Sequence, residues 1–366
     1  MQSLRLLADD LTGALDTSAE LVGAFGPLDI YWSLDEAPAG EASFAFDSGS
    51  RELDAVQAAA GVRRLTPLLC GAAIAFKKMD SLLRGPWAVE IAACLQAGSW
   101  DACIVAPAFV HQGRRTRAGQ QYAQGADGNW HAVGGNLVED LRRQNLATRL
   151  VDLKANPKVD LQTGVSVFDA ETDQDLDRVV EIGRRYAGKL LWCGAGGLTA
   201  ALAQGTQASV ARSLKAPVLG VFGSDHPATE AQLEACEDLV IRAAQGFLDV
   251  DHIKRRLGEG VALVRLTPPG TKSRTQAAQH FADEIVRLTQ SIAKPATLII
   301  AGGETLKAQC VAVGARALRV FGRLEPGVPK SVIQGGAWAG VDVISKSGAF
   351  GPPGLWRNLL SENSLI

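Results

Sequence analysis

The chain has 366 residues, of which 47% are hydrophobic and 21% charged. These are ordinary fractions for a globular protein and exclude a disordered or fibrous chain. At roughly 150 residues per domain, the length predicts about two domains. The 37 Lys and Arg residues against 39 Asp and Glu give a formal net charge of −2, which favours neither a nucleic acid nor an anionic membrane as a partner.

The cysteines and histidines form no metal-binding pattern. The six cysteines include no C-x-x-C pair, and the five histidines include no H-x-x-x-H or H-x-H pair. We therefore expect buried thiols in a reducing compartment and no metal held by the protein alone. No apolar run has the length needed to span a bilayer, and two aspartates within the first ten residues argue against a signal peptide. The sequence thus predicts a cytoplasmic protein.

Short apolar runs alternate with amphipathic segments through the first part of the chain. The strands predicted there are 4–8, 28–32, 43–46, 73–76, 102–105, 165–168 and 190–192. The helices predicted between them are 11–22, 53–65, 87–96, 137–144, 173–185 and 198–204. This alternation predicts βαβ units and a mostly parallel sheet. The polar, glycine-rich segment 111–136 predicts a long functional or hairpin loop.

A weak change of composition at 204–216 precedes a second series of the same kind. Its predicted strands are 218–222, 247–250, 263–266, 298–301, 317–320 and 341–344, and its predicted helices are 230–244, 276–292 and 306–313. We therefore predict two α/β domains, 1–210 and 211–366, each with a mostly parallel sheet flanked by helices. Ligands of such sheets bind outside the carboxyl ends of the strands, so polar residues that follow strands are the candidate site residues.

The motif ADDLTGA at 8–14 places Asp9 and Asp10 directly after the first predicted strand. One aspartate suffices to cap the helix that follows. A second adjacent carboxylate costs repulsion unless it binds hydroxyl groups or accepts a proton. Successive strand residues point to opposite faces, so we expect only one aspartate, Asp10, to face the ligand, while Asp9 caps the helix.

The motif FKKMDSLLRG at 76–85 follows the strand 73–76 and carries Lys77, Lys78, Asp80 and Arg84. A solvated charged loop is one interpretation. The other is an anion site, because the lysines supply positive charge and Arg grips a carboxylate with two hydrogen bonds. Two other predicted strands are also followed by arginines that could add positive charge to such a site. These are Arg51 and, next to Gly113, Arg114.

Glycines follow three strands of the second part. Gly302 and Gly303 come after the strand 298–301, and Glu304 and Thr305 open the next helix. Free N–H groups and the helix dipole make such a turn a phosphate site, although a tight capped turn has the same pattern. Ser224 and Gly348 occupy similar positions after the strands 218–222 and 341–344. The three loops could enclose the phosphates of a nucleotide, without a P-loop of the G-x-x-x-x-G-K-[ST] type.

The segment LLWCGAGGLTAAL at 190–202 offers a different interpretation. It resembles a dinucleotide-binding turn, but Thr199 stands where the third glycine belongs, and no acidic residue ends the following strand. An NAD-linked oxidoreductase is therefore the weaker alternative.

Taken in order, the motifs resemble the four-carbon acid sugar kinase family, formerly a domain of unknown function, DUF1537. The resemblance rests on ADDLTGA at 8, FKKMDSLLRG at 76, CGAGGL at 193, AGGET at 301 and KSGAFG at 346. It implies an N-terminal domain for the sugar acid, a C-terminal domain for ATP and an active site in the cleft between them. The form KKMDSLLRG resembles the threonate/erythronate kinase branch of the family.

The resemblance implies a role for each candidate residue. ATP would contact Ser224, Gly302, Gly303, Glu304, Thr305 and Gly348. The sugar-acid site would contain Asp9, Asp10, Arg51, Lys78, Asp80 and Arg84, with Gly113 and Arg114 at the same edge. Asp10, or else Asp80, would take the proton of the hydroxyl group.

The expected reaction is the ATP-dependent phosphorylation of a terminal hydroxyl group on a four-carbon aldonate, with Mg²⁺ entering on ATP. The partner is a small-molecule sugar acid, and a homo-oligomer is compatible with the sequence. One alternative is a binding protein without turnover, a relic of the family, because Asp225-His226 puts an acidic group next to the expected phosphate.

Overall fold

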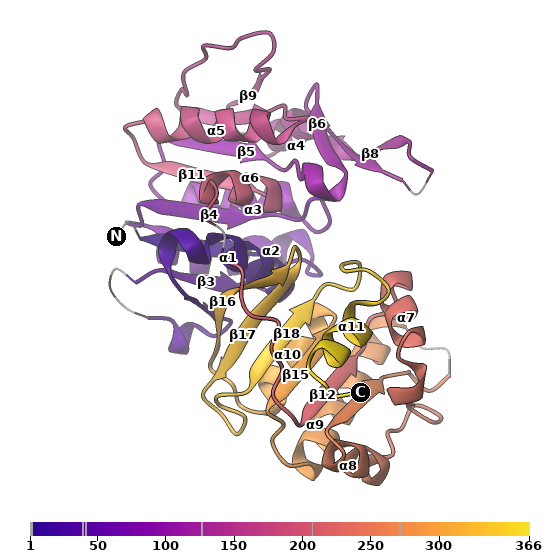
Figure 1. Cartoon of the computed structure of the whole chain (residues 1–366). Helices are drawn as coiled ribbons and strands as arrows, with labels where there is room; N and C mark the ends of the chain where they lie inside the picture. Colours follow the sequence, from indigo (N-terminus) through magenta and orange to yellow (C-terminus); the bar gives the residue numbers. More distant parts are fainter. Residues whose placement is uncertain (1–2, 39, 41, 126, 207, 271–272) are drawn as a thin grey trace. The chain divides into compact units, whose positions relative to one another are not determined.

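The computed structural model describes residues 3–38, 40, 42–125, 127–206, 208–270 and 273–366 (Figure 1). The chain divides into two compact units, Met1–Gln207 and Ala208–Ile366, which are called the N-terminal and C-terminal domains below. Both are built from strands alternating with helices, so the prediction of two α/β domains is confirmed.

The N-terminal domain is built on a parallel sheet. In sheet order its strands are β2 (Leu28–Tyr31), β3 (Phe44–Asp47), β1 (Leu4–Ala8), β4 (Ile74–Lys78), β11 (Leu190–Gly194), β5 (Ala102–Ala106), β10 (Gly164–Phe168) and β9 (Thr148–Val151). Every neighbouring pair is parallel. Inner strands such as β3 and β5 are buried on both faces, as expected when helices cover the two sides of a parallel sheet.

Two groups of helices accompany this sheet. One group is α1 (Leu11–Phe25), α5 (Asp173–Arg185) and α6 (Gly196–Ala203), and the other is α2 (Ala55–Leu65), α3 (Trp87–Ala97) and α4 (Leu137–Arg143). The second group packs on the central strands through a continuous apolar core that includes Leu7, Ile91 and Val105. Because the strands are parallel, the loops that follow β1, β3, β4 and β5 emerge at the same edge of the sheet.

The segment 111–136 is a small antiparallel sheet rather than a long loop. Its strands are β6 (Arg114–Arg117), β7 (Gln120–Gln124) and β8 (Trp130–Asn136). Ala118 and Gly119 join β6 to β7 with φ values of +50° and +71°, the conformation of a two-residue hairpin turn. The hairpin interpretation was therefore correct for β6 and β7, and the prediction missed β8, whose second half contains the adjacent glycines Gly134 and Gly135.

The C-terminal domain has a mixed sheet. In sheet order its strands are β13 (Val240–Arg242), β14 (Val261–Arg265), β12 (Val218–Phe222), β15 (Thr297–Ala301), β18 (Asp342–Lys346), β17 (Val328–Gln334) and β16 (Ala317–Glu325). The pairs from β13 to β18 are parallel, and β16 and β17 are antiparallel to their neighbours. The helices are α7 (Pro227–Glu234), α8 (Val250–Gly258), α9 (Arg274–Ser291), α10 (Gly303–Ala312) and α11 (Leu355–Glu362).

Two predicted elements of the C-terminal domain are wrong. The helix predicted at 230–244 ends at Glu234, and Val240–Arg242 instead forms the edge strand β13 beside β14. The strand predicted at 247–250 is absent, because the Asp249 carboxylate accepts a hydrogen bond from the His252 N–H and caps α8. Short apolar runs do not distinguish a strand from the first turn of a helix. Among the described residues, no helix is both long and apolar enough to cross a bilayer.

Candidate active site

The two aspartates of ADDLTGA lie immediately beyond the end of β1. Asp10 caps α1: its carboxylate accepts hydrogen bonds from the Gly13 N–H at 2.8 Å and from the Thr12 hydroxyl at 2.6 Å. The expectation that Asp9 would supply the cap is therefore wrong. Gly13 is required here, because a Cβ atom would lie 2.6 Å from Asp10 Oδ1 and 3.4 Å from Lys78 Nζ.

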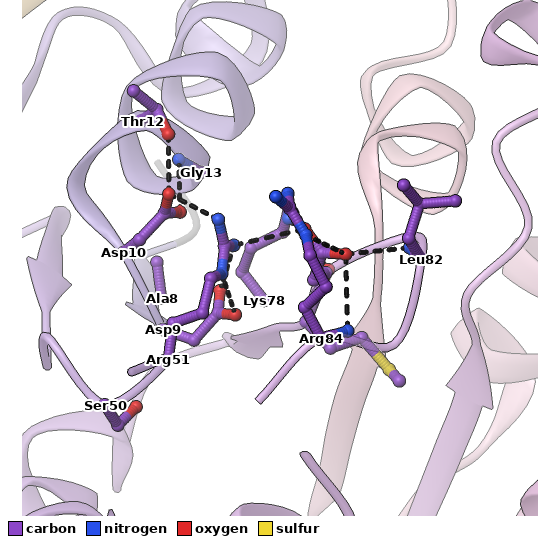
Figure 2. Close-up of polar contacts among 12 residues, drawn as sticks. Ala8, Asp9, Asp10, Thr12, Gly13, Ser50, Arg51, Lys78, Leu82 and Arg84 are labelled. Atoms are coloured by element: carbon purple, nitrogen blue, oxygen red, sulfur yellow. Dashed lines mark hydrogen bonds and ion pairs between the residues drawn. The ribbon is translucent and has the colours of Figure 1, made fainter. Parts of the chain in front are cut away.

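Arg51, in the loop after β3, joins both aspartates (Figure 2). Its guanidinium donates two hydrogen bonds to Asp9, at 2.8 and 2.9 Å, and a further one to Asp10. Its side chain is only 11% exposed. Strand alternation does not separate the two carboxylates, because both lie past the last strand residue and both contact Arg51. This corrects the expectation that only one of them would face the site.

The pKa values of Asp9 and Asp10 are shifted from their ordinary value in opposite directions. Burial works against the charge of Asp9, but Arg51 and then Lys78 outweigh it, and the pKa of Asp9 lies below its ordinary value. Burial is also the largest influence at Asp10. Arg51 opposes it, but burial and the negative charge of Asp9 together outweigh Arg51, so the pKa of Asp10 is raised. Neighbouring groups with pKa values driven apart are typical of acid and base roles.

Asp80 and Arg84 form a second ion pair after β4. The Asp80 carboxylate accepts from the Leu82 N–H at 2.8 Å and from the Arg84 guanidinium at 3.1 and 2.6 Å. Arg51 also lies 3.6 Å from Asp80. Burial raises the pKa of Asp80, but Arg84 and Arg51 outweigh it and hold that pKa well below its usual range. A carboxylate so strongly held in its charged form is a poor proton acceptor at neutral pH, which favours Asp10 over Asp80 as a base.

Lys77 and Lys78 end β4 and have different environments. Lys77 is buried and forms an ion pair with Glu90 of α3 at 2.6 Å, so it belongs to the core and not to an anion site. Lys78 donates to the Met79 carbonyl at 2.8 Å, and its charge acts on Asp9, Asp10 and Asp80. Of the two lysines predicted to hold an anion, only Lys78 lies in the site.

Arg114 and Gly113 lie where β6 begins. Arg114 is partly buried, its Nε atom has no hydrogen-bond partner, and within the described residues it forms no ion pair. Burial lowers the pKa of Arg114, opposed by the charge of Asp80. Gly113 has a left-handed φ of +64°, and its N–H and C=O bond to Val110 and Gln124. The structure shows a turn-forming role for Gly113, and its substrate contact stays a prediction.

The glycines of the C-terminal domain gather at one strand edge. β12, β15 and β18 are adjacent and parallel, so the residues that follow them meet. A Cβ atom on Gly348 would lie 2.1 Å from Ser224 Oγ, and one on Gly302 would lie 3.2 Å from Thr305 Oγ1. The structure therefore brings together the residues predicted to contact ATP.

Gly302 gives this edge its turn. Its φ of +107° is open to glycine but strained for other residues, and it is the N-cap of α10. Gly303, Glu304 and Thr305 form the first turn of that helix, so their N–H groups lie at its positive end. Asp225 and His226 are exposed, and His226 Nδ1 accepts a hydrogen bond from the Ala228 N–H as the cap of α7.

The turn between β11 and α6 has a packing role. A Cβ atom on Gly196 would lie 2.7 Å from the Phe109 ring, and one on Gly197 would lie 2.4 Å from the Ala108 carbonyl oxygen. The space over these glycines is thus filled by the protein itself. The observation removes the support for a dinucleotide at this turn.

The fold and site define a two-domain α/β protein with a carboxylate–arginine cluster in one domain and a glycine-rich strand edge in the other. The model of a sugar-binding N-terminal domain matches residues 4–202, and that of a nucleotide-binding C-terminal domain matches residues 219–355. The chain belongs to the four-carbon acid sugar kinase family, as the sequence motifs predicted.

Characterised relatives extend over nearly the whole chain. It is 28% identical to a D-threonate kinase of Bordetella bronchiseptica, with 94% of both chains covered. It is 30% identical to a D-threonate kinase of Cupriavidus necator, with 96% of both chains covered. A crystal structure of a Haemophilus influenzae protein of the DUF1537 family matches the fold with a TM-score of 0.71 at 19% identity, covering 98% of this chain and 100% of the other. The predicted class of enzyme, a phosphotransferase, is confirmed at the level of the family.

Proposed function

We propose that the chain is an ATP-dependent kinase that phosphorylates the terminal hydroxyl group of a four-carbon aldonate such as threonate or erythronate. The observation that carries the proposal is the cluster in which the buried guanidinium of Arg51 holds the adjacent carboxylates of Asp9 and Asp10. The opposite directions of their pKa shifts agree with an acid–base role for the pair. The D-threonate kinases among the relatives support the choice of substrate class.

In the proposed reaction the terminal hydroxyl oxygen attacks the γ-phosphorus of ATP. A new O–P bond forms, the bond between the γ-phosphorus and the bridging oxygen breaks, and ADP leaves. Asp10 accepts the hydroxyl proton, for which its raised pKa suits it. Because phosphoryl transfer depends mainly on positioning and charge neutralisation, the remaining residues bind and orient.

The carboxylate of the sugar acid needs cations that the protein does not already neutralise. Arg51 and Arg84 are paired with Asp9, Asp10 and Asp80. Lys78 donates to a carbonyl oxygen, and Arg114 has no ion pair in the described chain. We therefore assign the grip on the substrate carboxylate chiefly to Arg114 and Lys78, and the fixing of the aspartates to Arg51 and Arg84.

The glycine edge fits a polyphosphate, because Gly302 caps α10 without a side chain and the N–H groups of the next three residues lie at the positive end of that helix. The carboxylates of the N-terminal site are committed to guanidinium groups, so we assign Mg²⁺ to the phosphates of ATP. When bound there, Mg²⁺ supplies charge neutralisation. The prediction of an active site between the two domains stays a prediction.

An ADP-release assay across C4 to C6 aldonates and their keto forms tests the function. The expected result is turnover with a four-carbon aldonate and ATP. Calorimetry with ADP and Mg²⁺ accompanies it, because a relic would bind a ligand and turn over none of these acids. Binding without turnover would overturn the kinase proposal in favour of the relic.

A further inference from the structure

Lys346, the last residue of β18, is a buried cation that has no carboxylate partner among the described residues. Its side chain is 1% exposed. The ammonium donates to three neutral oxygen atoms: the Gly348 carbonyl at 2.9 Å, the Ser347 carbonyl at 3.2 Å and the Thr229 hydroxyl at 3.2 Å. Buried charges are normally paired, and Lys77 at the end of β4 follows that rule with Glu90 at 2.6 Å. Lys346 therefore differs from an ordinary buried lysine.

The surroundings of Lys346 supply no countercharge. The titratable side chains on the elements that accompany β18 are His226, Glu230 and Glu234 at α7, Lys330 of β17, Glu304, Lys307 and Cys310 of α10, and Arg357 and Glu362 of α11. Within the described part of the chain, none of them forms an ion pair with Lys346; Glu230 pairs with Arg265, and Lys330 lies near Asp342. Burial alone therefore acts on the ammonium and lowers the pKa of Lys346 to about 8.

The hydrogen bonds of Lys346 also fix the direction of two peptide groups. In a trans peptide the N–H points opposite to the preceding C=O. Since the carbonyls of Ser347 and Gly348 point at the ammonium, the N–H groups of Gly348 and Ala349 point away from it. Neither N–H donates to a protein acceptor among the described residues. The two N–H groups lie in a turn, which the Phe350 N–H closes by donating to the Ser347 carbonyl at 3.2 Å. Successive free N–H groups in a turn can bind an anion in the arrangement called a nest.

The position of this nest links it to the glycine edge. Gly348 lies against Ser224, and the Thr229 hydroxyl donates to the Gly348 carbonyl at 2.9 Å. We infer that Lys346 is a positioning residue for nucleotide binding: it orients the N–H groups of Gly348 and Ala349 toward a phosphate group, whose negative charge in turn compensates the buried ammonium. The inference rests on the proposed nucleotide substrate.

The inference makes nucleotide binding depend on the protonation of Lys346. A phosphate held at these N–H groups lies across the two peptide groups from the ammonium. Its negative charge favours the charged form of Lys346, so binding raises the pKa of Lys346, and the affinity falls as pH rises through about 8. Calorimetry with ADP and Mg²⁺ should give an affinity for the natural chain that is roughly tenfold weaker at pH 9 than at pH 7.5. At pH 8.5, titrations in buffers of different ionisation enthalpy should show uptake of a fraction of a proton.

Two variants complete the test. Lys346→Met should bind ADP about 10- to 100-fold more weakly at pH 7.5, the range expected for loss of a charged donor, and should lose the pH dependence above 7.5. Lys346→Arg should retain part of the affinity and show no decline up to pH 9. Lys330→Met, on the neighbouring strand β17, is the matched control and should keep the pH profile of the natural chain.

The outcomes separate this inference from the proposed function. A natural chain that binds ADP with no decline above pH 8 and no proton uptake overturns the role of Lys346, whether or not Lys346→Met folds, and leaves the kinase proposal standing. A natural chain that binds no nucleotide at any pH overturns the proposed function, and the role of Lys346 with it.

Discussion

The two strand edges that carry the candidate site residues manage charge in opposite ways. At the edge of the N-terminal domain, Asp9, Asp10 and Asp80 are matched by Arg51 and Arg84 at hydrogen-bond distance. At the edge of the C-terminal domain the site consists of glycines and small hydroxyl residues around a buried ammonium, which pairs with no carboxylate in the part of the chain that the structure describes. The first edge is organised before a ligand arrives, whereas the second offers N–H groups and one charge to an incoming anion.

The difference suits the two proposed substrates. A sugar acid carries one charge and several hydroxyl groups, and paired carboxylates and guanidiniums can accept from and donate to such groups without a large net charge. A nucleoside triphosphate carries several negative charges and is bound well by backbone N–H groups at a helix N-terminus. If this comparison is right, substitutions at the two edges should affect different substrates.

The largest effect is expected from Asp10→Asn. Asparagine is as good an N-cap as aspartate, so the α1 cap and the fold should survive, but the base is lost. We expect kcat to fall by roughly 10²–10⁴, with little change in the binding of either substrate, measured by steady-state kinetics and calorimetry. If Asp9→Asn is instead the inactive variant, the two roles are exchanged, and if both remain active the base lies elsewhere, with Asp80 the next candidate.

The next effect concerns the stability of the N-terminal domain. Arg51→Met leaves Asp9 and Asp10 buried without their common partner, and breaking a buried ion pair in this way costs about 3–5 kcal/mol. We expect the free energy of unfolding to fall by that amount in urea denaturation. Arg63→Met, at an exposed position on α2, should unfold like the natural chain. Equal stabilities of Arg51→Met and Arg63→Met would show that the cluster is not a stabilising unit.

Arg114→Met tests the grip on the substrate carboxylate. A hydrogen bond to a charged group contributes about 1.5–3 kcal/mol, so KM for the sugar acid should rise by roughly 10- to 150-fold while KM for ATP stays the same. Arg117→Met, exposed on the same strand β6, serves as the control. A comparable rise in both KM values would mean that Arg114 is structural.

Gly348→Ala applies the same logic to the other edge. The new methyl group would lie 2.1 Å from Ser224 Oγ, so the loop or the serine must move, at a cost of about 1–3 kcal/mol. We expect weaker ADP binding and unchanged sugar-acid binding in calorimetry. A Cβ atom on Gly258 of α8 has no neighbour within 4 Å, and Gly258→Ala should bind ADP normally. Unchanged affinity of Gly348→Ala would remove Gly348 from the nucleotide site.

How far sequence reasoning reached depends on the kind of interaction. The placement of ADDLTGA after β1 and of the glycines after β15 and β18 follows from local apolar runs and turn residues, and the structure confirms it. The partner of each charge does not follow, because Arg51 reaches Asp9 across 42 positions and only the packed sheet brings them together. Alternation separates Lys77 from Lys78 but cannot say which of them meets Glu90.

Lys346 is a second residue whose surroundings the local sequence does not predict. It lies in KSGAFG, a segment that the sequence singled out for Gly348 alone, and its distinguishing feature is the lack of a carboxylate neighbour. That feature belongs to the packing of β18 beside α7, and no local pattern reports it. The one signal in the sequence was that Lys346 ends an apolar strand and comes directly before a glycine-containing loop.

The smallest effect is expected for a change of charge near the site of the N-terminal domain, measured as a change in the stability of the fold. Asp16 of α1 has a buried carboxylate oxygen for which the described residues supply no hydrogen-bond partner. Burial raises the pKa of Asp16 well above 3.8; the charge of Lys78 opposes this, and those of Asp10 and Glu20 add to it.

Because the pKa is raised in the folded state, the contribution of Asp16 to stability is fully present below pH 3.8 and is lost as pH rises through its folded pKa. Asp16→Asn keeps the shape and removes the charge, so it should unfold at a higher temperature than the natural chain at pH 7. The difference should shrink toward pH 4, where both side chains are neutral. Asp173→Asn, exposed on α5, should show no such pH-dependent gain. An Asp16→Asn chain that is less stable at pH 7 would mean that the charge of Asp16 is needed by Lys78, so that the first edge extends its charge matching one turn further into α1.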